Sequence, residues 1–177
     1  MDIVAHGLWA AVGVGLARQR WPIARRTAAA TVATAVMPDL LQLVPLLGIA
    51  IGSREGMAVL PAYIGALPGA EPSLPATVQW LSHHLHCIPH SAVIAGAATL
   101  LVWAVTKSFW LPLAGWWSHI VIDFFTHSAD FYPAPVLYPF TEWGFDGWAW
   151  NTPMALALNY AALVAAGLYL VRARRAA

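Results

Sequence analysis

Five apolar runs, separated by more polar connections, dominate the sequence. They cover residues 3–17, 27–51, 89–106, 109–126 and 153–171. A helix needs about 20 predominantly apolar residues to cross a bilayer, because the hydrocarbon core is about 30 Å thick. The runs therefore predict an all-α, polytopic membrane helix bundle of about five spans, with residues 1–177 forming a single transmembrane domain.

The composition agrees with a protein that is integral in the membrane. Apolar residues make up 60% of the chain and charged residues only 10%, with a mean hydropathy of +0.64. A soluble domain usually contains about 25% charged residues, so this chain could not cover its surface in water. The formal net charge of +1 gives no reason to expect a nucleic-acid partner. The first ten residues lack the basic start of a signal peptide, so we expect the first run to be retained.

Basic residues mark the shorter connections and predict the orientation of the chain. The first connection holds Arg18, Arg20, Arg25 and Arg26, the third holds Lys107, and "RARR" at residues 172–175 follows the fifth run. Short loops rich in Lys and Arg stay on the cytoplasmic side. The pattern therefore predicts an N-terminus outside and a C-terminus inside the cell.

The second and fourth connections, residues 52–88 and 128–152, then face the outer side. The former contains "TVQWLSHHLHC", which we interpret as a short interfacial helix, and the latter is dense in aromatic residues. Trp and Tyr favour the headgroup level of a bilayer. Both connections are therefore predicted to contribute interfacial segments at the outer leaflet.

Three ionisable residues follow one another at intervals of four in the second half of the fourth run and directly after it: His119, Asp123 and His127. On a helix of 3.6 residues per turn they form one slanted stripe. A charge in the middle of a membrane costs roughly 2.5–3.5 kcal/mol even on the lenient insertion scale, so a metal ion or a charge partner is expected to offset it. A hydrogen-bonded pair between helices is the alternative interpretation of this stripe.

Other runs place His or Asp toward the same leaflet. The predicted metal ligands are His6, Asp39, His90, His119 and Asp123. Imidazole and carboxylate together suit a divalent metal, with zinc favoured and manganese or iron as alternatives. A catalytic site of this kind keeps one coordination position open for water.

The segment "HHLHCIPHS", residues 83–91, is harder to interpret. Pro89 suits a first helical turn, so we expect His90 to open the third span, with no continuous helix running through His86 and His90. Because imidazole titrates near neutral pH, His86 or His127 is predicted to act as the general acid or base. Which of His83, His84 and His86 take part stays open. Cys87 could bind a soft metal, although a lone cysteine is more often a packing residue.

Several short motifs follow one another along most of the chain. They are His6-Gly7, Pro38-Asp39, His90-Ser91, His119 with Asp123 and Thr126, and "LYPF" at residues 137–140. In this order they resemble the YdjM-like membrane-bound metal-dependent hydrolases of bacteria. The resemblance implies a multi-pass protein of the bacterial inner (plasma) membrane with hydrolase activity. The family usually repeats an acid two residues after the first, where this chain has Leu41, which argues against a two-metal site.

The leading hypothesis is a membrane-embedded hydrolase that cleaves a lipid or lipid-linked substrate at the outer leaflet with metal-activated water. The aromatic residues of segment 131–150 would hold an acyl or prenyl chain, and both a phosphoester and an amide are open as the scissile bond. One alternative is a ceramidase-like zinc amidase, although those enzymes typically have seven spans. Another is a non-enzymatic metal or proton carrier, which predicts polar groups reaching both membrane faces. A structural scaffold would leave the inward carboxylates unexplained.

Overall fold

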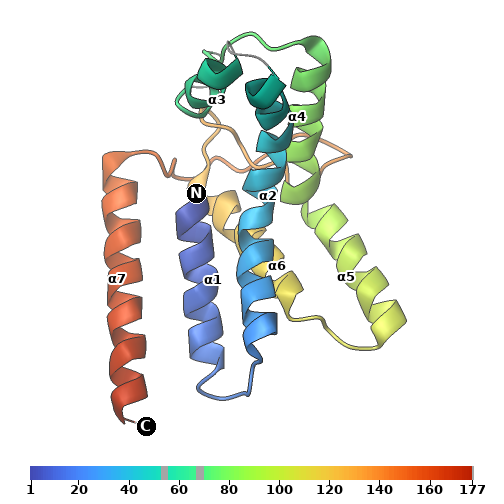
Figure 1. Cartoon of the computed structure of the whole chain (residues 1–177). Coiled ribbons are helices and arrows are strands. Elements are labelled where there is room, and N and C mark those ends of the chain that lie inside the picture. Colours follow the sequence, from blue (N-terminus) through green and yellow to red (C-terminus); the bar gives the residue numbers. More distant parts are fainter. Residues whose placement is uncertain (53–55, 67–69, 177) are drawn as a thin grey trace.

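The structure is a computed structural model that describes residues 1–52, 56–66 and 70–176. The described chain is helical and contains no strand, which confirms the all-α prediction (Figure 1). The helices are α1 (Ile3–Ala17), α2 (Arg25–Gly52), α3 (Gly56–Ile64), α4 (Ala76–His90), α5 (Ala92–Thr106), α6 (Pro112–Thr126) and α7 (Pro153–Ala176).

The helix boundaries follow the apolar runs closely, because local signals start the helices. Asp2 caps α1 by accepting a hydrogen bond from the Ala5 amide at 2.9 Å. Pro112 occupies the first turn of α6, where its missing N–H removes no helical hydrogen bond. Pro38 lies inside α2, yet the helix is continuous over all of its 28 residues.

The predicted start of the third span is wrong. His90 is the last residue of α4, which runs unbroken through His86 and Pro89, and α5 begins only at Ala92. The two helices meet at an angle of 61°. Ser91 lies at the bend and caps α5, because its hydroxyl accepts a hydrogen bond from the Ile94 amide at 3.1 Å. Pro89 therefore ends a helix instead of starting one, and its carbonyl accepts a hydrogen bond from Trp116 Nε1 at 2.6 Å.

Two of the described helices, α2 and α7, are long and apolar enough to cross a bilayer. The bent α4–α5 pair adds a third candidate if it forms one broken span. Apolar α1 has 15 residues, which at 1.5 Å per residue reach about 22 Å and fall short of a hydrocarbon core of about 30 Å. Helical length and composition thus give two or three candidate spans, and they do not establish the predicted five.

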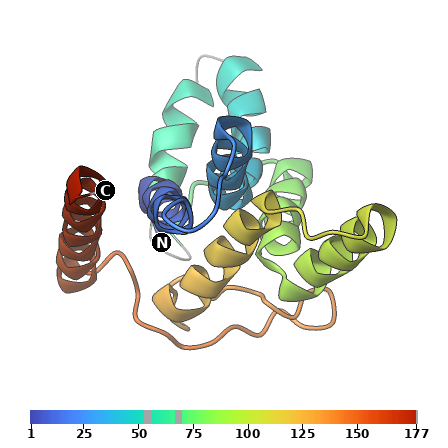
Figure 2. The same ribbon diagram turned by 90° about the horizontal axis from the view of Figure 1, so that it is seen from below.

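Helix α2 lies at the centre of the bundle and packs against α1, α3, α4 and α6 (Figure 2). Its closest approach is to α6 at Gly115, where an added Cβ would lie 1.9 Å from the carbonyl oxygen of Thr31. The hydroxyl of Thr34 donates to the carbonyl of Pro112 at 2.5 Å in the same region. Small residues and interhelical hydrogen bonds are the usual means of close helix packing in membranes. They fix the register of α6 against α2, on which the site described below depends.

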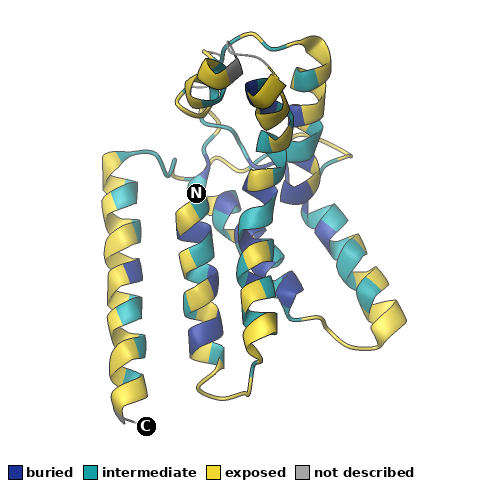
Figure 3. Cartoon of the chain, in the orientation of Figure 1, coloured by how far each residue is buried: buried dark blue, intermediate teal, exposed yellow. Residues whose placement is uncertain are grey.

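The outward faces of α5 and α7 are largely exposed, whereas buried residues gather where α1, α2, α4 and α6 meet (Figure 3). Exposed side chains of α5 and α7 include Leu100, Leu101, Val105, Val164 and Leu168. Water would disfavour so many exposed apolar side chains, and lipid would not. The outward faces of these helices therefore suit contact with hydrocarbon.

Candidate metal centre

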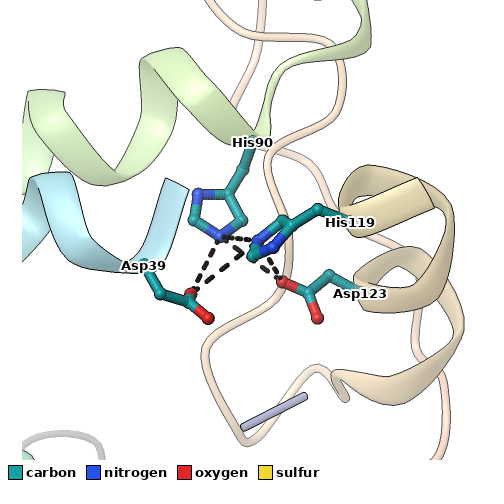
Figure 4. A group of neighbouring side chains, drawn as sticks. All are labelled: Asp39, His90, His119 and Asp123. Atoms are coloured by element: carbon teal, nitrogen blue, oxygen red, sulfur yellow. Dashed lines mark hydrogen bonds and ion pairs between the residues drawn. The ribbon is translucent and has the colours of Figure 1, made fainter. Parts of the chain in front are cut away.

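Four ionisable side chains converge where α2, α4 and α6 meet (Figure 4). Asp39 comes from α2, His90 from the end of α4, and His119 and Asp123 from successive turns of α6. Their exposed fractions are 7%, 1%, 0% and 0% respectively. One ligand atom from each residue lies within 4.8 Å of the other three. The structure thus brings together four of the five predicted metal ligands.

The spacing of these atoms fits one small cation. His119 Nε2 lies 3.0 Å from both His90 Nε2 and Asp123 Oδ2, and His90 Nε2 lies 3.4 Å from Asp123 Oδ2. Asp39 Oδ1 is 3.5 Å from His90 Nε2 and 3.8 Å from His119 Nε2. Zinc binds nitrogen and oxygen ligands at about 2.0–2.2 Å, which puts neighbouring ligands of a tetrahedron about 3.3–3.6 Å apart. The separations between ligand atoms in the structure, 3.0 to 3.8 Å, lie on both sides of this range.

The hydrogen bonds of the two histidines leave a lone pair on each Nε2. Nδ1 of His90 lies 2.7 Å from the carbonyl oxygen of His86, and Nδ1 of His119 lies 2.7 Å from that of Ala35. A carbonyl can only accept, so in the neutral ring each Nδ1 carries the proton and each Nε2 is an acceptor. Backbone carbonyls commonly orient metal-binding histidines in this way. Two acceptors facing each other at 3.0 Å require a cation or a proton between them.

The two carboxylates also indicate a bound cation. Asp39 Oδ2 and Asp123 Oδ2 are buried and have no hydrogen-bond partner among the described residues. A buried carboxylate oxygen without a partner is unfavourable. Two carboxylates and two neutral imidazoles around a divalent ion sum to zero charge, which lowers the cost of burial. The donor set therefore fits a resident divalent metal, and zinc, manganese and iron all accept such ligands.

His6, the fifth predicted ligand, stands beside the group of four. Its Nε2 lies 2.9 Å from Asp123 Oδ1, and its ring stacks on that of His119 with centroids 3.8 Å apart. Because the carboxylate accepts, His6 Nε2 carries a proton and orients Asp123. The amino group of Met1 also contacts Asp123 Oδ1. In this arrangement His6 positions Asp123 and stands outside the group of four, and its direct coordination of a metal stays a prediction.

The two predicted acid–base histidines flank the centre on the side of a large cavity. His127 follows α6, and its Nε2 lies 3.5 Å from Asp123 Oδ1. Its Nδ1 donates to the carbonyl of Tyr132 at 2.6 Å, so Nε2 is the acceptor. On α4, Nδ1 of His86 lies 3.0 Å from Gln42 Oε1. Because an amide oxygen accepts, His86 likewise keeps Nε2 as its acceptor in the neutral form.

The cavity has a volume of about 1120 Å³, and Asp39, His86 and His127 all line it. Most of its wall is apolar, with Leu43 and Ile64 among the contributors. Sites for small amphiphilic molecules commonly combine an apolar wall with a few polar groups. Of the four clustered residues, Asp39 is the one on the wall of the cavity. The cluster is therefore reached from the side of Asp39.

The segment between α6 and α7, residues 127–152, covers the C-terminal end of α6. The amides of Gly147 and Trp148 donate to the carbonyls of His127 and Phe125 at 2.8 and 3.0 Å. An added Cβ on Gly147 would lie 2.4 Å from the carbonyl oxygen of Phe125, so this close contact requires glycine. Between these two ends the segment extends to the start of α5, where the Ala92 amide donates to the Val136 carbonyl at 2.9 Å, and it then turns back toward α7 (Figure 2).

Gln42 and Glu71 line the cavity but were not predicted from the sequence, and neither was the pairing of Glu71 with Tyr132. The Tyr132 hydroxyl donates to Glu71 Oε1 at 2.5 Å. Burial and this hydrogen bond raise the pKa of Tyr132, so the phenol stays neutral at physiological pH. Gln42 follows Asp39 by three residues, a spacing that places both on one face of α2. That spacing could have identified Gln42, whereas nothing local pairs Glu71 with Tyr132.

Comparison with protein-family models, with curated proteins and with solved structures finds no match to this chain. Any conclusion about function therefore rests on the residues and their geometry.

Proposed function

We propose that this chain is a membrane-embedded, metal-dependent hydrolase that acts on a lipid or lipid-linked substrate at the outer leaflet of the bacterial inner membrane. The observation that supports the proposal best is the buried Asp39–His90–His119–Asp123 group at the wall of a largely apolar cavity. The ordered motifs shared with the YdjM-like hydrolases support the same proposal.

The four clustered residues would hold a divalent metal, which when bound lowers the pKa of a water molecule and polarises a carbonyl or phosphoryl oxygen. His6 keeps Asp123 oriented through the 2.9 Å contact to Oδ1. His127 Nε2 accepts from the Met1 amino group at 3.1 Å beside the same carboxylate, and the residue lines the cavity. It would exchange this partner for the attacking water, take a proton from it and return the proton to the leaving group. His86, held by Gln42, is the second candidate for this role.

The cavity favours an amphiphilic substrate. Its apolar wall would hold an acyl or prenyl chain, while Asp39, His86 and His127 face the polar part. The aromatic residues of segment 131–150, such as the half-exposed Trp143 and Trp148, suit the headgroup level. Both an amide and a phosphoester fit this arrangement as the scissile bond.

A metal or proton carrier is less well supported. A transport path requires polar groups that continue to the opposite membrane face. Among the buried polar residues that the structure describes, Thr31 is the one toward the basic end of the molecule, and its hydroxyl donates to Thr27 within α2 at 2.9 Å. A ceramidase-like amidase would need more spanning helices than the two or three candidates in the described chain.

The most direct test is hydrolysis by the detergent-purified protein after chelation and reloading with zinc, manganese or ferrous iron. The probes are long-chain acyl amides, acyl esters and alkyl phosphoesters with a chromogenic leaving group. We expect metal-dependent cleavage of one bond class, and short-chain analogues should react more slowly because they leave the apolar wall uncovered. Absence of cleavage of every class by metal-loaded protein would reject the proposed hydrolase function.

The orientation, with the N-terminus outside and about five segments embedded in the bilayer, is also part of the proposal. The α1–α2 connection, the α5–α6 connection and the C-terminus lie at one end of the molecule, and α3 and α4 lie at the other (Figure 1). The basic residues Arg18, Arg20 and Lys107 belong to the first group of segments. Positive charge favours the cytoplasmic side.

We predict that the end of the molecule with α3 and α4 is reached from outside the cytoplasm. In a Cys87→Ser background, a cysteine replacing exposed Ala129 should react with a membrane-impermeant thiol reagent in intact spheroplasts. The matched control, a cysteine replacing exposed Gln19 in the α1–α2 connection, should react only after the membrane is breached. The reverse pattern would show that the orientation is inverted.

A further inference from the structure

A second group of potential metal ligands lies on the outer part of α4. His83 and Cys87 are four residues apart and share one face of the helix, and Glu142 reaches them from segment 127–152. His83 Nε2 lies 3.0 Å from Glu142 Oε1 and 3.6 Å from Cys87 Sγ. The three ligand atoms all lie within 4.8 Å of one another.

These distances fit a thiophilic ion. Zinc binds thiolate at about 2.3 Å and imidazole or carboxylate at about 2.0–2.2 Å. In a tetrahedron those lengths put sulfur about 3.5–3.6 Å from nitrogen, and nitrogen about 3.3–3.5 Å from oxygen. The observed 3.6 Å matches the first value, and 3.0 Å is a few tenths of an ångström shorter than the second. A small outward movement of the exposed Glu142 side chain would complete the match.

This group is separate from the buried centre and differs from it in chemistry. The two share no residue, and His83 precedes His90 by seven residues, about 10 Å along the axis of α4. Cys87 is 2% exposed, whereas the side chains of His83 and Glu142 are 45% and 64% exposed. A buried sulfur beneath two exposed ligands leaves the fourth coordination position open to water. Thiolate and imidazole together select zinc-class ions over magnesium or calcium.

We propose that His83, Cys87 and Glu142 form a second binding site for a thiophilic divalent ion such as zinc, which fastens segment 127–152 to α4. Binding forms a bond from the metal to Cys87 Sγ, and the thiol proton is released to solvent. The segment already contacts α4 nearby, because the Tyr138 hydroxyl lies 3.0 Å from His84 Nδ1. His83 also lines the large cavity, so an ion at this site holds one edge of that cavity in place.

Cys87 is the only cysteine of the chain, so thiolate chemistry reports on this site alone. The full-length protein in detergent is titrated with Cd²⁺, and the ultraviolet thiolate-to-cadmium absorption and the rate of Cys87 alkylation are recorded. We expect the absorption band to appear and alkylation to slow by at least tenfold. Both effects should persist in Asp123→Asn, which disables the buried centre, and in His84→Ala, the matched control.

Both effects should be lost in His83→Ala and in Glu142→Gln, whose substituted side chains are exposed and can change without disturbing a core. Metal content offers an independent readout, with one zinc ion fewer per chain in Cys87→Ser than in wild type. Loss of the band in Asp123→Asn, or its retention in both His83→Ala and Glu142→Gln, would overturn the proposal. So would the absence of a band in wild type. Hydrolase activity enters none of these measurements, so their outcome is independent of the proposed function.

Discussion

Asp123→Asn is expected to abolish divalent-metal binding at the buried centre and, with it, the stabilisation that the metal provides. Asp123 is the residue with the most contacts in the site, because Oδ2 faces His90 and His119 while Oδ1 faces His6 and His127. An ion that binds only the folded state adds RT ln(1 + [L]/Kd) to stability, about 2.7 kcal/mol at a hundredfold excess over Kd. Asparagine keeps the shape of the side chain and removes its charge.

The measurement is thermal unfolding of the detergent-purified protein with a chelator and then with added zinc or manganese. The Cys87→Ser background removes the thiolate ligand of the second site. The Cys87→Ser protein with Asp123 intact should melt at a lower temperature after chelation, and added metal should restore its melting temperature. The melting temperature of Cys87→Ser/Asp123→Asn should change with neither treatment. Asp130→Asn changes an exposed acid seven residues after Asp123 and should behave like wild type. A metal response that survives in Asp123→Asn would show that the ion binds elsewhere.

His127→Gln is expected to lower the rate of hydrolysis by about 10²–10⁴, the usual contribution of a general acid–base, while the metal stays bound. His127 Nε2 is an acceptor beside Asp123 and lines the cavity, yet the residue stands outside the group of four ligands. Glutamine keeps a polar side chain of similar size, but it cannot carry a proton between water and leaving group.

The comparison uses turnover and metal content measured on the same samples, with His84→Gln as the matched control on α4. Loss of metal together with activity would identify His127 as a ligand. Unchanged turnover would exclude His127 as the acid–base and transfer that role to His86, for which His86→Gln is the corresponding variant.

The sequence was most informative where the signal was local. Apolar runs located the helices, and α1 spans the same residues, 3–17, as the first run. The periodicity of a helix was enough to predict that His119 and Asp123 share one face, and both residues belong to the cluster of four. Asp39 and His90 could be included because the predicted topology brought their helices toward the same leaflet. The structure places both beside the stripe.

Features that depend on long-range contacts could not be predicted. The helix break falls at Ser91 and not at Pro89, because the Ser91 hydroxyl both caps α5 and donates to the Tyr138 carbonyl at 2.6 Å. The role of His6 follows from which atom faces Asp123, and a sequence does not contain that information. The sequence left the part played by His83 open, because Glu142, its partner, is 59 residues away.

The number of spans shows the limit of hydropathy as a guide. The fourth run is helical from Pro112 to Thr126, and its 15 residues reach about 22 Å. A segment of this length, carrying two buried ionisable residues, is stabilised by its neighbours in the bundle more than by lipid. Helical propensity and burial were thus predictable, whereas the depth of each helix in the bilayer depends on how the whole bundle packs.

The central claim, that Asp39, His90, His119 and Asp123 bind one metal ion, is tested most directly by X-ray absorption at the zinc edge. The sample is Cys87→Ser loaded with a single equivalent of zinc, which removes the thiolate site from the spectrum. The claim predicts two imidazole nitrogens and carboxylate oxygens at about 2.0–2.2 Å and no sulfur. The imidazole signal should fall by half in His119→Ala. A spectrum without imidazole scattering, or one unchanged by His119→Ala, would contradict it.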